Sequence, residues 1–229
     1  MLSVKKINVA YGSAKVLHDV SLDLGQGEMV FIAGRNGAGK TTLLKSIAGF
    51  MRPSSGSIVF DGRELVGLPP ERISLAGIRY VFQDKRVFSH LSVRENLELA
   101  AYPVGEDMTD AIAKVVRIYP KIEQFLDARA GGLSGGQRQI LLIGRALIGS
   151  PRLLLIDEPT EGLAAGTIND ILKVLTMMKG QVSMIIVEQN LSVVGMLADR
   201  VYIMQEGKIV REVGDPAEIR DKGRLEQYL

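Results

Sequence analysis

Residues 34–41 constrain the fold of this chain more than any other segment. They read Gly-Arg-Asn-Gly-Ala-Gly-Lys-Thr, which matches the phosphate-loop pattern G-x-x-x-x-G-K-[ST]. The pattern is meaningful only where it follows a strand and opens a helix. Residues 29–33 form a short apolar run and residues 41–50 have helical length, so both neighbours are expected. The sequence therefore predicts a strand, loop and helix unit that binds phosphate.

The residue types of this loop suit an anion. Glycines let backbone N–H groups turn inward around phosphate oxygens at the positive end of a helix. Lys40 is expected to reach the β- and γ-phosphates of a nucleotide and Thr41 to bind Mg²⁺. The candidate nucleotide-binding residues of the loop are Gly34, Arg35, Asn36, Gly37, Ala38, Gly39, Lys40, Thr41 and Thr42.

The composition limits what else the chain can be. Its 229 residues, 46% hydrophobic and 24% charged, are enough for one large α/β domain with a full core. The absence of cysteine excludes a disulfide scaffold, a thiolate zinc site and a cysteine nucleophile. A net charge of +2, from 28 basic and 26 acidic residues, gives no strong field for nucleic acid. We therefore expect a globular domain that does not bind DNA or RNA.

The hydrophobic pattern predicts one α/β domain over residues 1–229. Residues 2–11 and 16–24 alternate as an antiparallel pair joined at Gly12-Ser13, and helical periodicity fills much of the stretch between residues 92 and 149. Further strands are expected at 57–60, 78–82, 153–156, 183–187 and 201–205, and helices at 93–102, 108–119, 134–148, 167–179 and 191–197. We expect a mixed or parallel sheet, an N-terminal antiparallel β subdomain and an inserted helical subdomain. The core then spans 1–84 and 150–229, and the helical subdomain about 85–149.

Some segments carry only ordinary signals. Gly207-Lys208 and Asp215-Pro216 are interpreted as turns, and the charges over residues 218–226 as a solvated helix face. The first six residues lack the apolar run of a signal peptide, and no apolar run reaches membrane-spanning length. We expect a protein that is not exported and whose membrane role, if any, is peripheral.

The apolar run over residues 153–156 leads into two carboxylates, Asp157 and Glu158. Alternate side chains of a strand point in opposite directions, so the two groups are expected to have different roles. Beside a phosphate loop, Asp157 suits the Mg²⁺ shell, and Glu158 suits the orientation or deprotonation of the water that attacks the γ-phosphate. Without the phosphate loop the same pair would be interpreted as the capped end of a strand.

Residues 133–137 read Leu-Ser-Gly-Gly-Gln and precede a helical pattern. Ser134 suits the N-cap, and Gly135 and Gly136 leave helix N–H groups accessible to an anion. Taken alone, the segment could equally be a plain helix cap.

In this order the phosphate loop, the five-residue signature and the Asp-Glu strand resemble the ATP-binding-cassette (ABC) ATPases, over essentially the whole chain. The resemblance implies an α/β fold with a P-loop nucleoside-triphosphatase core, ATP and Mg²⁺ as cofactors, and ATP hydrolysis as the activity. In that family two cassettes pair head to tail, and the signature of one closes over ATP held by the other. The resemblance thus implies that Ser134 and Gly136 act in trans, and Gly135 and Gln137 are further candidate nucleotide-binding residues of the signature.

The resemblance also assigns roles to Tyr11 and Gln83. Tyr11 is expected to stack on adenine, since aromatic faces suit that contact, although a tyrosine at a strand end can simply pack there. Gln83 corresponds to the glutamine that touches Mg²⁺ and the attacking water and reports occupancy to the membrane partner. Its alternative is an ordinary surface glutamine.

The chain departs from the family at its switch position. Gln189 stands where many cassettes have a histidine. A neutral amide can hydrogen-bond the γ-phosphate but cannot become charged, so Glu158 is expected to carry more of the water-orienting work. The catalytic residues are expected to be Glu158, Gln189 and Lys40, and the metal site to contain Thr41, Gln83 and Asp157. Residues 159–165 also lack the aspartate that is common in the family's dimer-contact loop.

Several segments resemble one subfamily, the second ATPase of bacterial branched-chain amino-acid importers. They are Glu188-Gln189-Asn190, Glu161-Gly162-Leu163-Ala164, Arg86-Val87-Phe88 before residues 91–97, and residues 143–147. Phe82-Gln83-Asp84-Lys85 stands where the subfamily usually has Pro-Glu-Gly-Arg, and Ala165 replaces a usual proline. Close relatives serve urea, short amides and aromatic acids, so such solutes are alternatives to branched-chain amino acids.

The resemblance implies a set of partners at the cytoplasmic face of the inner membrane. They are a second cassette in a homo- or heterodimer, two membrane permeases and, indirectly, a periplasmic solute-binding protein. A groove around residues 83–91 is expected to receive a short permease helix, with Val87, Phe88 and Leu91 as anchors.

Two functions of other classes are alternatives to transport. A non-transport cassette that acts on nucleic acid or ribosomes predicts tandem cassettes or a long coiled-coil insertion, and this chain has neither. A phosphate-loop GTPase or kinase is disfavoured because the chain has no Asn-Lys-x-Asp guanine motif and carries the cassette signature.

Overall fold

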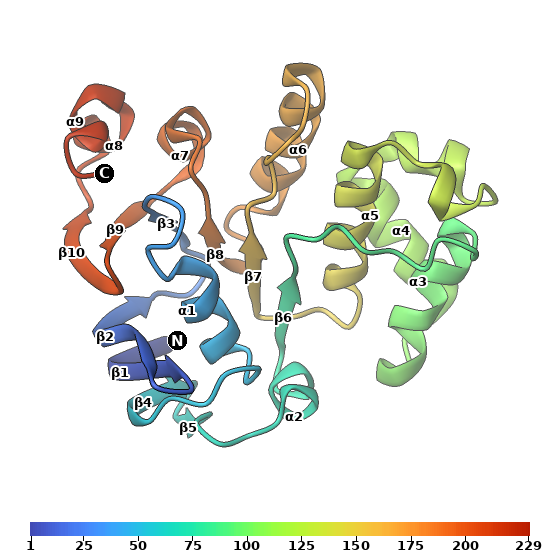
Figure 1. Ribbon diagram of the computed structural model, residues 1–229. Coiled ribbons are helices and arrows are strands. Elements are labelled where there is room, and N and C mark those ends of the chain that lie inside the picture. The colour runs from blue at the N-terminus through green and yellow to red at the C-terminus, as the bar shows by residue number, and fades with distance from the viewer.

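The computed structural model describes residues 1–229 and contains two β-sheets with helices around them (Figure 1). The first sheet has four antiparallel strands in the order β2-β1-β4-β5. These are β1 (Leu2–Tyr11), β2 (Ala14–Leu24), β4 (Ser55–Phe60) and β5 (Arg63–Glu64). Tyr11 pairs with Ala14 across a turn in which Gly12 has a φ of 59°, a left-handed value that glycine adopts readily. The expected N-terminal antiparallel unit is therefore confirmed.

The second sheet has six strands in the order β10-β9-β3-β8-β7-β6. They are β3 (Met29–Ala33), β6 (Ile78–Val81), β7 (Leu153–Asp157), β8 (Ser183–Val187), β9 (Arg200–Gln205) and β10 (Lys208–Val213). All neighbours from β6 to β9 are parallel, and β10 is an antiparallel edge strand. Strand β10 is not among the strands expected from the sequence. Only Val213 of its six residues is buried, so the strand has no apolar alternation.

Helices cover both faces of this sheet and extend beyond its β6 edge. They are α1 (Lys40–Ile47), α2 (Pro70–Leu75), α3 (Val93–Ala101), α4 (Met108–Ile118), α5 (Gly135–Leu147), α6 (Ala165–Met178), α7 (Leu191–Leu197), α8 (Pro216–Arg220) and α9 (Lys222–Glu226). In Figure 1, α3, α4 and α5 gather to the right of β6. Helix α1 ends three residues earlier than expected because Gly49, with a φ of 80°, turns the chain out of the helix.

Two apolar layers bury the two faces of the six-stranded sheet. Val30 and Ile32 of β3 pack toward the first sheet together with α1, whereas Phe31 packs toward α6 and α7. A parallel sheet that is covered on both faces is built from strands that are apolar at nearly every position. A third apolar cluster, which includes Leu97 and Val115, lies among α3, α4 and α5. The structure thus has the P-loop nucleoside-triphosphatase architecture that the sequence predicts.

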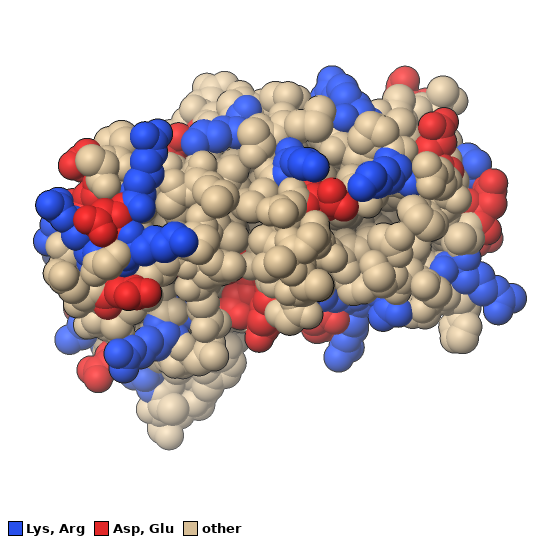
Figure 2. Space-filling model, turned by 90° about the horizontal axis from the view of Figure 1, so that it is seen from above, with Lys and Arg blue, Asp and Glu red and all other residues tan.

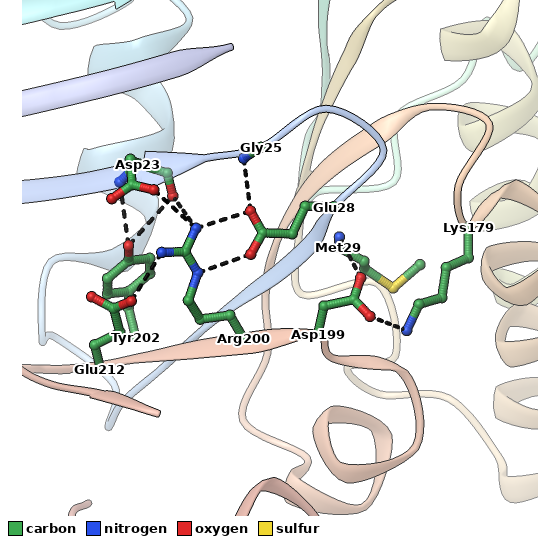
Figure 3. Close-up of polar contacts among 9 residues, drawn as sticks. All are labelled: Asp23, Gly25, Glu28, Met29, Lys179, Asp199, Arg200, Tyr202 and Glu212. Carbon is green, nitrogen blue, oxygen red and sulfur yellow. Dashed lines mark hydrogen bonds and ion pairs between the residues drawn. The ribbon is translucent and has the colours of Figure 1, made fainter. Parts of the chain in front are cut away.

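An ion-pair network joins the two sheets at the amino ends of β3 and β9 (Figure 3). Arg200 donates two bonds of 2.8 and 2.9 Å to the carboxylate of Glu28, which precedes β3. It also bonds Asp23 of β2 at 3.1 Å and Glu212 of β10 at 2.9 Å. Partial burial alone would lower the pKa of Arg200, but the hydrogen bonds that it donates to Glu28, Glu212 and Asp23 raise this pKa overall. This edge of the sheet is therefore held by structural charge pairs.

Charged side chains of both signs are interspersed on the face shown in Figure 2, with apolar and neutral surface between them. None of the helices combines the length and the apolar character needed to cross a lipid bilayer.

Candidate functional site

The phosphate loop lies between β3 and α1, at the carboxyl edge of the parallel strands. Gly37 and Gly39 have φ values of 82° and 102°, which other residues rarely adopt. A Cβ at Gly34 would lie 2.3 Å from the carbonyl oxygen of Met204, so that position has no room for a side chain. The glycines that the motif requires are thus explained by backbone conformation and by close packing.

The first turn of α1 is open to an anion. Gly39 caps the helix without a side-chain hydrogen bond, and no acidic residue lies in the first turn. The buried Lys40 bends back along the loop, where its Nζ donates to the carbonyls of Gly34 at 2.8 Å and Arg35 at 3.0 Å. Uncapped N–H groups, a helix N-terminus and a buried lysine fit the phosphates of a nucleotide.

Asp157 ends β7 beside this loop. Thr41 Oγ1 donates to its Oδ1 at 3.1 Å, and the hydroxyl of Tyr80 in β6 donates to its Oδ2 at 2.8 Å. Burial raises the pKa of Asp157, although the bonds from Tyr80 and Thr41 oppose the shift. Burial and the nearby Asp157 raise the pKa of Tyr80, so the phenol remains a proton donor. Tyr80 is not among the site residues expected from the sequence, because its contact with Asp157 depends on which strands are neighbours.

The protein oxygens at this position suit Mg²⁺ only when a nucleotide supplies further ligands. No cluster of three or more His, Asp or Glu side chains that could hold a metal ion is present. Thr41 and Asp157 supply two oxygen ligands beside a cavity of about 390 Å³ that Gln83 also lines. Mg²⁺ is commonly bound by one or two protein oxygens, with phosphates and waters completing the octahedron. The residues present therefore fit the metal.

Segments that are far apart in the sequence meet at Glu158. Its carboxylate accepts a 2.7 Å bond from Gln189 Nε2 at Oε1 and a 3.3 Å bond from Gln83 Nε2 at Oε2. Lys40 Nζ lies 3.7 Å from Oε1. The residues come from the loops after β3, β6, β7 and β8, which end at one edge of the sheet. Three residues that were expected from separate motifs, Lys40, Gln83 and Gln189, are thus brought together around the carboxylate of Glu158.

Gln189 also reaches the phosphate loop. Its Nε2 donates a 2.7 Å bond to Asn36 Oδ1, so one amide bridges the loop and Glu158. Gln83 makes a second bond of 2.7 Å to Glu161 Oε2. Both glutamines therefore act as neutral donors toward the carboxylates of this site.

The signature segment lies away from the phosphate loop of its own chain. Ser134 caps α5 by accepting from the Gln137 N–H at 3.3 Å, and the Gln137 side chain accepts from the Ser134 N–H at 2.8 Å. A Cβ at Gly136 would lie 1.8 Å from Thr167 Cγ2, so this glycine allows α5 to pack against α6. No hydrogen bond joins residues 133–137 to residues 34–42. Tyr11, at the end of β1, is 48% exposed.

A groove of about 980 Å³ runs between β6 and the helices α2 and α5. Its exposed apolar side chains include Leu75, Phe82 and Phe88, and the Arg145 guanidinium lies 5.0 Å from the ring centroid of Phe88. Val87 lines the groove as expected. Leu91 is not among the residues that line the groove, and its backbone bonds Phe88 and Ala130.

The phosphate loop, the carboxylates at the end of β7 and the parallel sheet that aligns them define a P-loop nucleoside triphosphatase. Comparison with known proteins narrows the class. The family model described as ABC transporter matches residues 17–161, which is more than half of the chain. The chain belongs to the ABC transporter family and is one of its ATP-binding, ATP-hydrolysing subunits.

Individual relatives agree with this assignment. The chain is 42% identical over 212 residues to the high-affinity branched-chain amino acid transport ATP-binding protein BraG of Pseudomonas aeruginosa, with 92% of this chain and 91% of BraG covered. It is 37% identical to the probable branched-chain amino acid transport ATP-binding protein LivF of Archaeoglobus fulgidus, with 91% and 90% covered. A dimeric ATP-binding cassette bound to ADP and Pi superimposes with a TM-score of 0.82 at 26% identity, with 93% and 98% covered.

Proposed function

We propose that this chain binds MgATP and hydrolyses it as one of two cassettes that power the import of branched-chain amino acids. The convergence of Gln83, Gln189 and Lys40 on the Glu158 carboxylate supports the hydrolytic role. The similarity to two amino-acid transport relatives over almost the whole chain supports the solute class. Urea, short amides and other small solutes are the competing outcomes of the transport test.

We propose the following nucleotide contacts. Lys40 and the N–H groups of the loop bind the phosphates, and Tyr11 stacks on adenine. The loop residues that take part are Gly34, Arg35, Asn36, Gly37, Ala38, Gly39, Thr41 and Thr42. Ser134, Gly135, Gly136 and Gln137 contact the nucleotide of the partner cassette, which agrees with the absence of hydrogen bonds between them and the phosphate loop of their own chain.

Thr41 and Asp157 are the proposed protein ligands of Mg²⁺, and Gln83 lies at the edge of the same site. The bound ion would neutralise charge that develops on the phosphate oxygens. Thr41 and Tyr80 hold the two carboxylate oxygens of Asp157, so its orientation is fixed before the nucleotide arrives.

Glu158 is the proposed base that orients or deprotonates the attacking water. The amides of Gln83 and Gln189 can only donate to its oxygens through N–H, so they stabilise the carboxylate form that can accept a proton. Gln189, which also bonds Asn36 of the loop, stands near the position expected for the γ-phosphate. Positioning and charge stabilisation are the main demands of phosphoryl transfer.

The proposed partners are a second cassette, in a homo- or heterodimer, two permeases and indirectly a periplasmic solute-binding protein. The proposed location is the cytoplasmic face of the inner membrane. We also propose the division into a core of residues 1–84 and 150–229 and a helical subdomain of about 85–149, which the separate apolar cluster of α3, α4 and α5 supports.

The groove between β6 and α5 is the proposed docking site of a short permease helix. Val87 and Phe88 are its proposed anchors, and exposed Leu75 and Phe82 extend the apolar wall. An exposed apolar groove of this kind suits the apolar face of an amphipathic helix.

The first test is copurification of the tagged chain from detergent-solubilised membranes of its native cell, with identification of bound proteins by mass spectrometry. Two permeases and a second cassette are the expected result. Radiolabelled leucine uptake by the reconstituted complex with its binding protein then tests the solute. Recovery of ribosomal or DNA-repair proteins in place of permeases would overturn the transport function, and uptake of urea or amides in place of leucine would overturn the solute class.

A further inference from the structure

Glu188 is a buried carboxylate that makes no ion pair. It follows β8 and is 3% exposed, and none of the salt bridges of the structure includes it. Burying an unpaired charge is costly unless hydrogen bonds replace the lost water. A residue of this kind requires an explanation in terms of the groups that it holds.

Four donors from two loops surround Glu188. Its Oε1 accepts from the Thr160 N–H at 3.0 Å and from the Thr160 hydroxyl at 2.5 Å. Its Oε2 accepts from the N–H groups of Gln189 at 3.0 Å and Asn190 at 3.1 Å. Only a carboxylate offers two oxygens with no donor, so an amide in this place would turn an N–H toward another N–H.

The two loops that Glu188 joins are the loops that meet at Glu158. Thr160 lies two residues after Glu158, and Gln189 bonds the Glu158 carboxylate through its side chain. Glu188 therefore fixes the backbone on both sides of the contact between Glu158 and Gln189.

The backbone at Glu158 needs such support. Its φ of 45° lies in the left-handed region, which non-glycine residues seldom occupy. A strained conformation of this kind persists only where neighbouring contacts fix it. The Glu158 N–H bonds the Val187 carbonyl at 3.0 Å on one side of the turn, and Thr160 is held by Glu188 on the other.

We propose that Glu188 is a positioning residue for ATP hydrolysis, which holds the strained turn of Glu158 and the backbone of Gln189 in one arrangement through four hydrogen bonds. The inference rests on the proposed role of Glu158. The phosphate loop is built separately from β3 and α1, so loss of Glu188 should affect the hydrolytic step far more than nucleotide binding.

The test is Glu188→Gln in the full chain assembled with its partners, with kcat and KM for ATP measured beside the affinity for a fluorescent ATP analogue. We expect kcat to fall at least about tenfold, because a misplacement of about 1 Å costs up to about a hundredfold. KM and analogue affinity should change by less than about twofold, since only the transition state loses an interaction.

Asn8→Asp is the matched control. Asn8 is a buried amide of β1 that donates to Lys6, Asp19 and Ser55 and accepts from the Asp19 N–H. Aspartate has the same shape as asparagine and breaks a comparable network in the first sheet. The variant should therefore have a lower melting temperature and an unchanged kcat. Thr160→Val, which loses one donor to Glu188, should lower kcat, and Thr160→Ser, which keeps both donors, should restore it.

Three results would overturn the proposal. In the first, Glu188→Gln and Asn8→Asp lose the same amount of stability, and kcat falls no further in Glu188→Gln than in Asn8→Asp. In the second, Thr160→Val and Thr160→Ser are equally active. The third is near-normal hydrolysis by Glu158→Gln, which also removes the proposed role of Glu158. An inactive Glu158→Gln together with an active Glu188→Gln rejects the positioning role alone and leaves the proposed function in place.

Discussion

Tyr80 donates a 2.8 Å hydrogen bond to Asp157 and also forms part of the wall of the apolar groove. Its ring packs against Phe82 with 4.3 Å between the ring centroids, and Phe50 lies next to both. One side chain thus lies between the proposed docking site and a proposed metal ligand. A change in the groove wall can therefore reach Asp157 through a single hydrogen bond.

Tyr80→Phe should raise the Mg²⁺ concentration that is needed for half-maximal ATP binding and hydrolysis by about tenfold, because loss of a partner of a metal ligand commonly weakens metal binding by that amount or more. ATP binding without Mg²⁺, measured by calorimetry, should not change. Tyr202→Phe removes a buried hydroxyl that bonds Asp23, remote from Asp157, and serves as the control. An unchanged Mg²⁺ requirement in Tyr80→Phe would contradict the role of this bond.

Glu158→Gln should bind ATP, lose nearly all hydrolysis and accumulate the closed dimer, because the amide keeps the shape of the side chain and cannot accept a proton from water. Size-exclusion chromatography with ATP and a phosphate-release assay check the two parts. Near-normal turnover would remove Glu158 from the role of base.

Phe88→Asp should abolish coupled transport while the ATPase activity of the isolated cassettes persists, since a charge in the apolar groove opposes docking of an apolar helix face. Solute uptake and ATP hydrolysis are measured on the same reconstituted preparation. Met196→Asp, a change at an exposed apolar residue of α7 outside the groove, is the control. If Phe88→Asp still transports, the docking site lies elsewhere.

Asp157→Asn should stabilise the nucleotide-free chain at neutral pH while it abolishes Mg²⁺-dependent hydrolysis. Burial raises the pKa of Asp157 above its ordinary value of 3.8, so ionisation at neutral pH costs folding stability. Asparagine removes that cost, and the hydroxyls of Thr41 and Tyr80 can still bond it. The melting temperature should rise by about 2 to 4 °C for each kcal/mol relieved.

The stabilisation expected for Asp157→Asn should depend on pH in one direction. The pKa of Asp157 is higher in the folded chain than in the unfolded chain. The neutral carboxyl of the wild type therefore contributes stability at low pH, and this contribution is lost as the pH rises through the folded-state pKa. The difference in melting temperature between Asp157→Asn and wild type should therefore shrink as the pH falls toward 3.8. A difference that grows on acidification would contradict the assignment.

Arg200→Met should lower stability by about 2 kcal/mol, or roughly 4 to 8 °C, because it leaves three carboxylates without their shared cation. The side chain of Arg200 is only 17% exposed, so water replaces these bonds poorly. Arg94→Met breaks an exposed pair with Asp127 and should cost no more than about 0.5 kcal/mol. Equal losses in thermal unfolding would show that the network in Figure 3 is no stronger than a surface pair.

The sequence alone determined the local chemistry of this protein. The glycines of residues 34–39, Lys40 and the Asp157-Glu158 pair are contiguous signals, because their function depends on backbone conformation and spacing within one segment. The buried strands β3, β7 and β8 were likewise visible as short apolar runs, since a parallel sheet covered on both faces leaves no polar position in the middle of a strand. The edge strand β10 was missed because its exposed positions carry no such signal.

Only the tertiary structure decided which of these signals share a site. Gln83, Glu158 and Gln189 are separated by up to about a hundred residues, and the strand order of the sheet places the ends of their strands side by side. Tyr80 acquires its role through its contact with Asp157, and Glu188 through its contacts with Thr160, Gln189 and Asn190. The segment that contains Glu188 resembles the subfamily, but nothing local in the sequence indicates which groups Glu188 holds. The physical reason is that a hydrogen bond between strands depends on strand order and register, which long-range packing of the whole core sets.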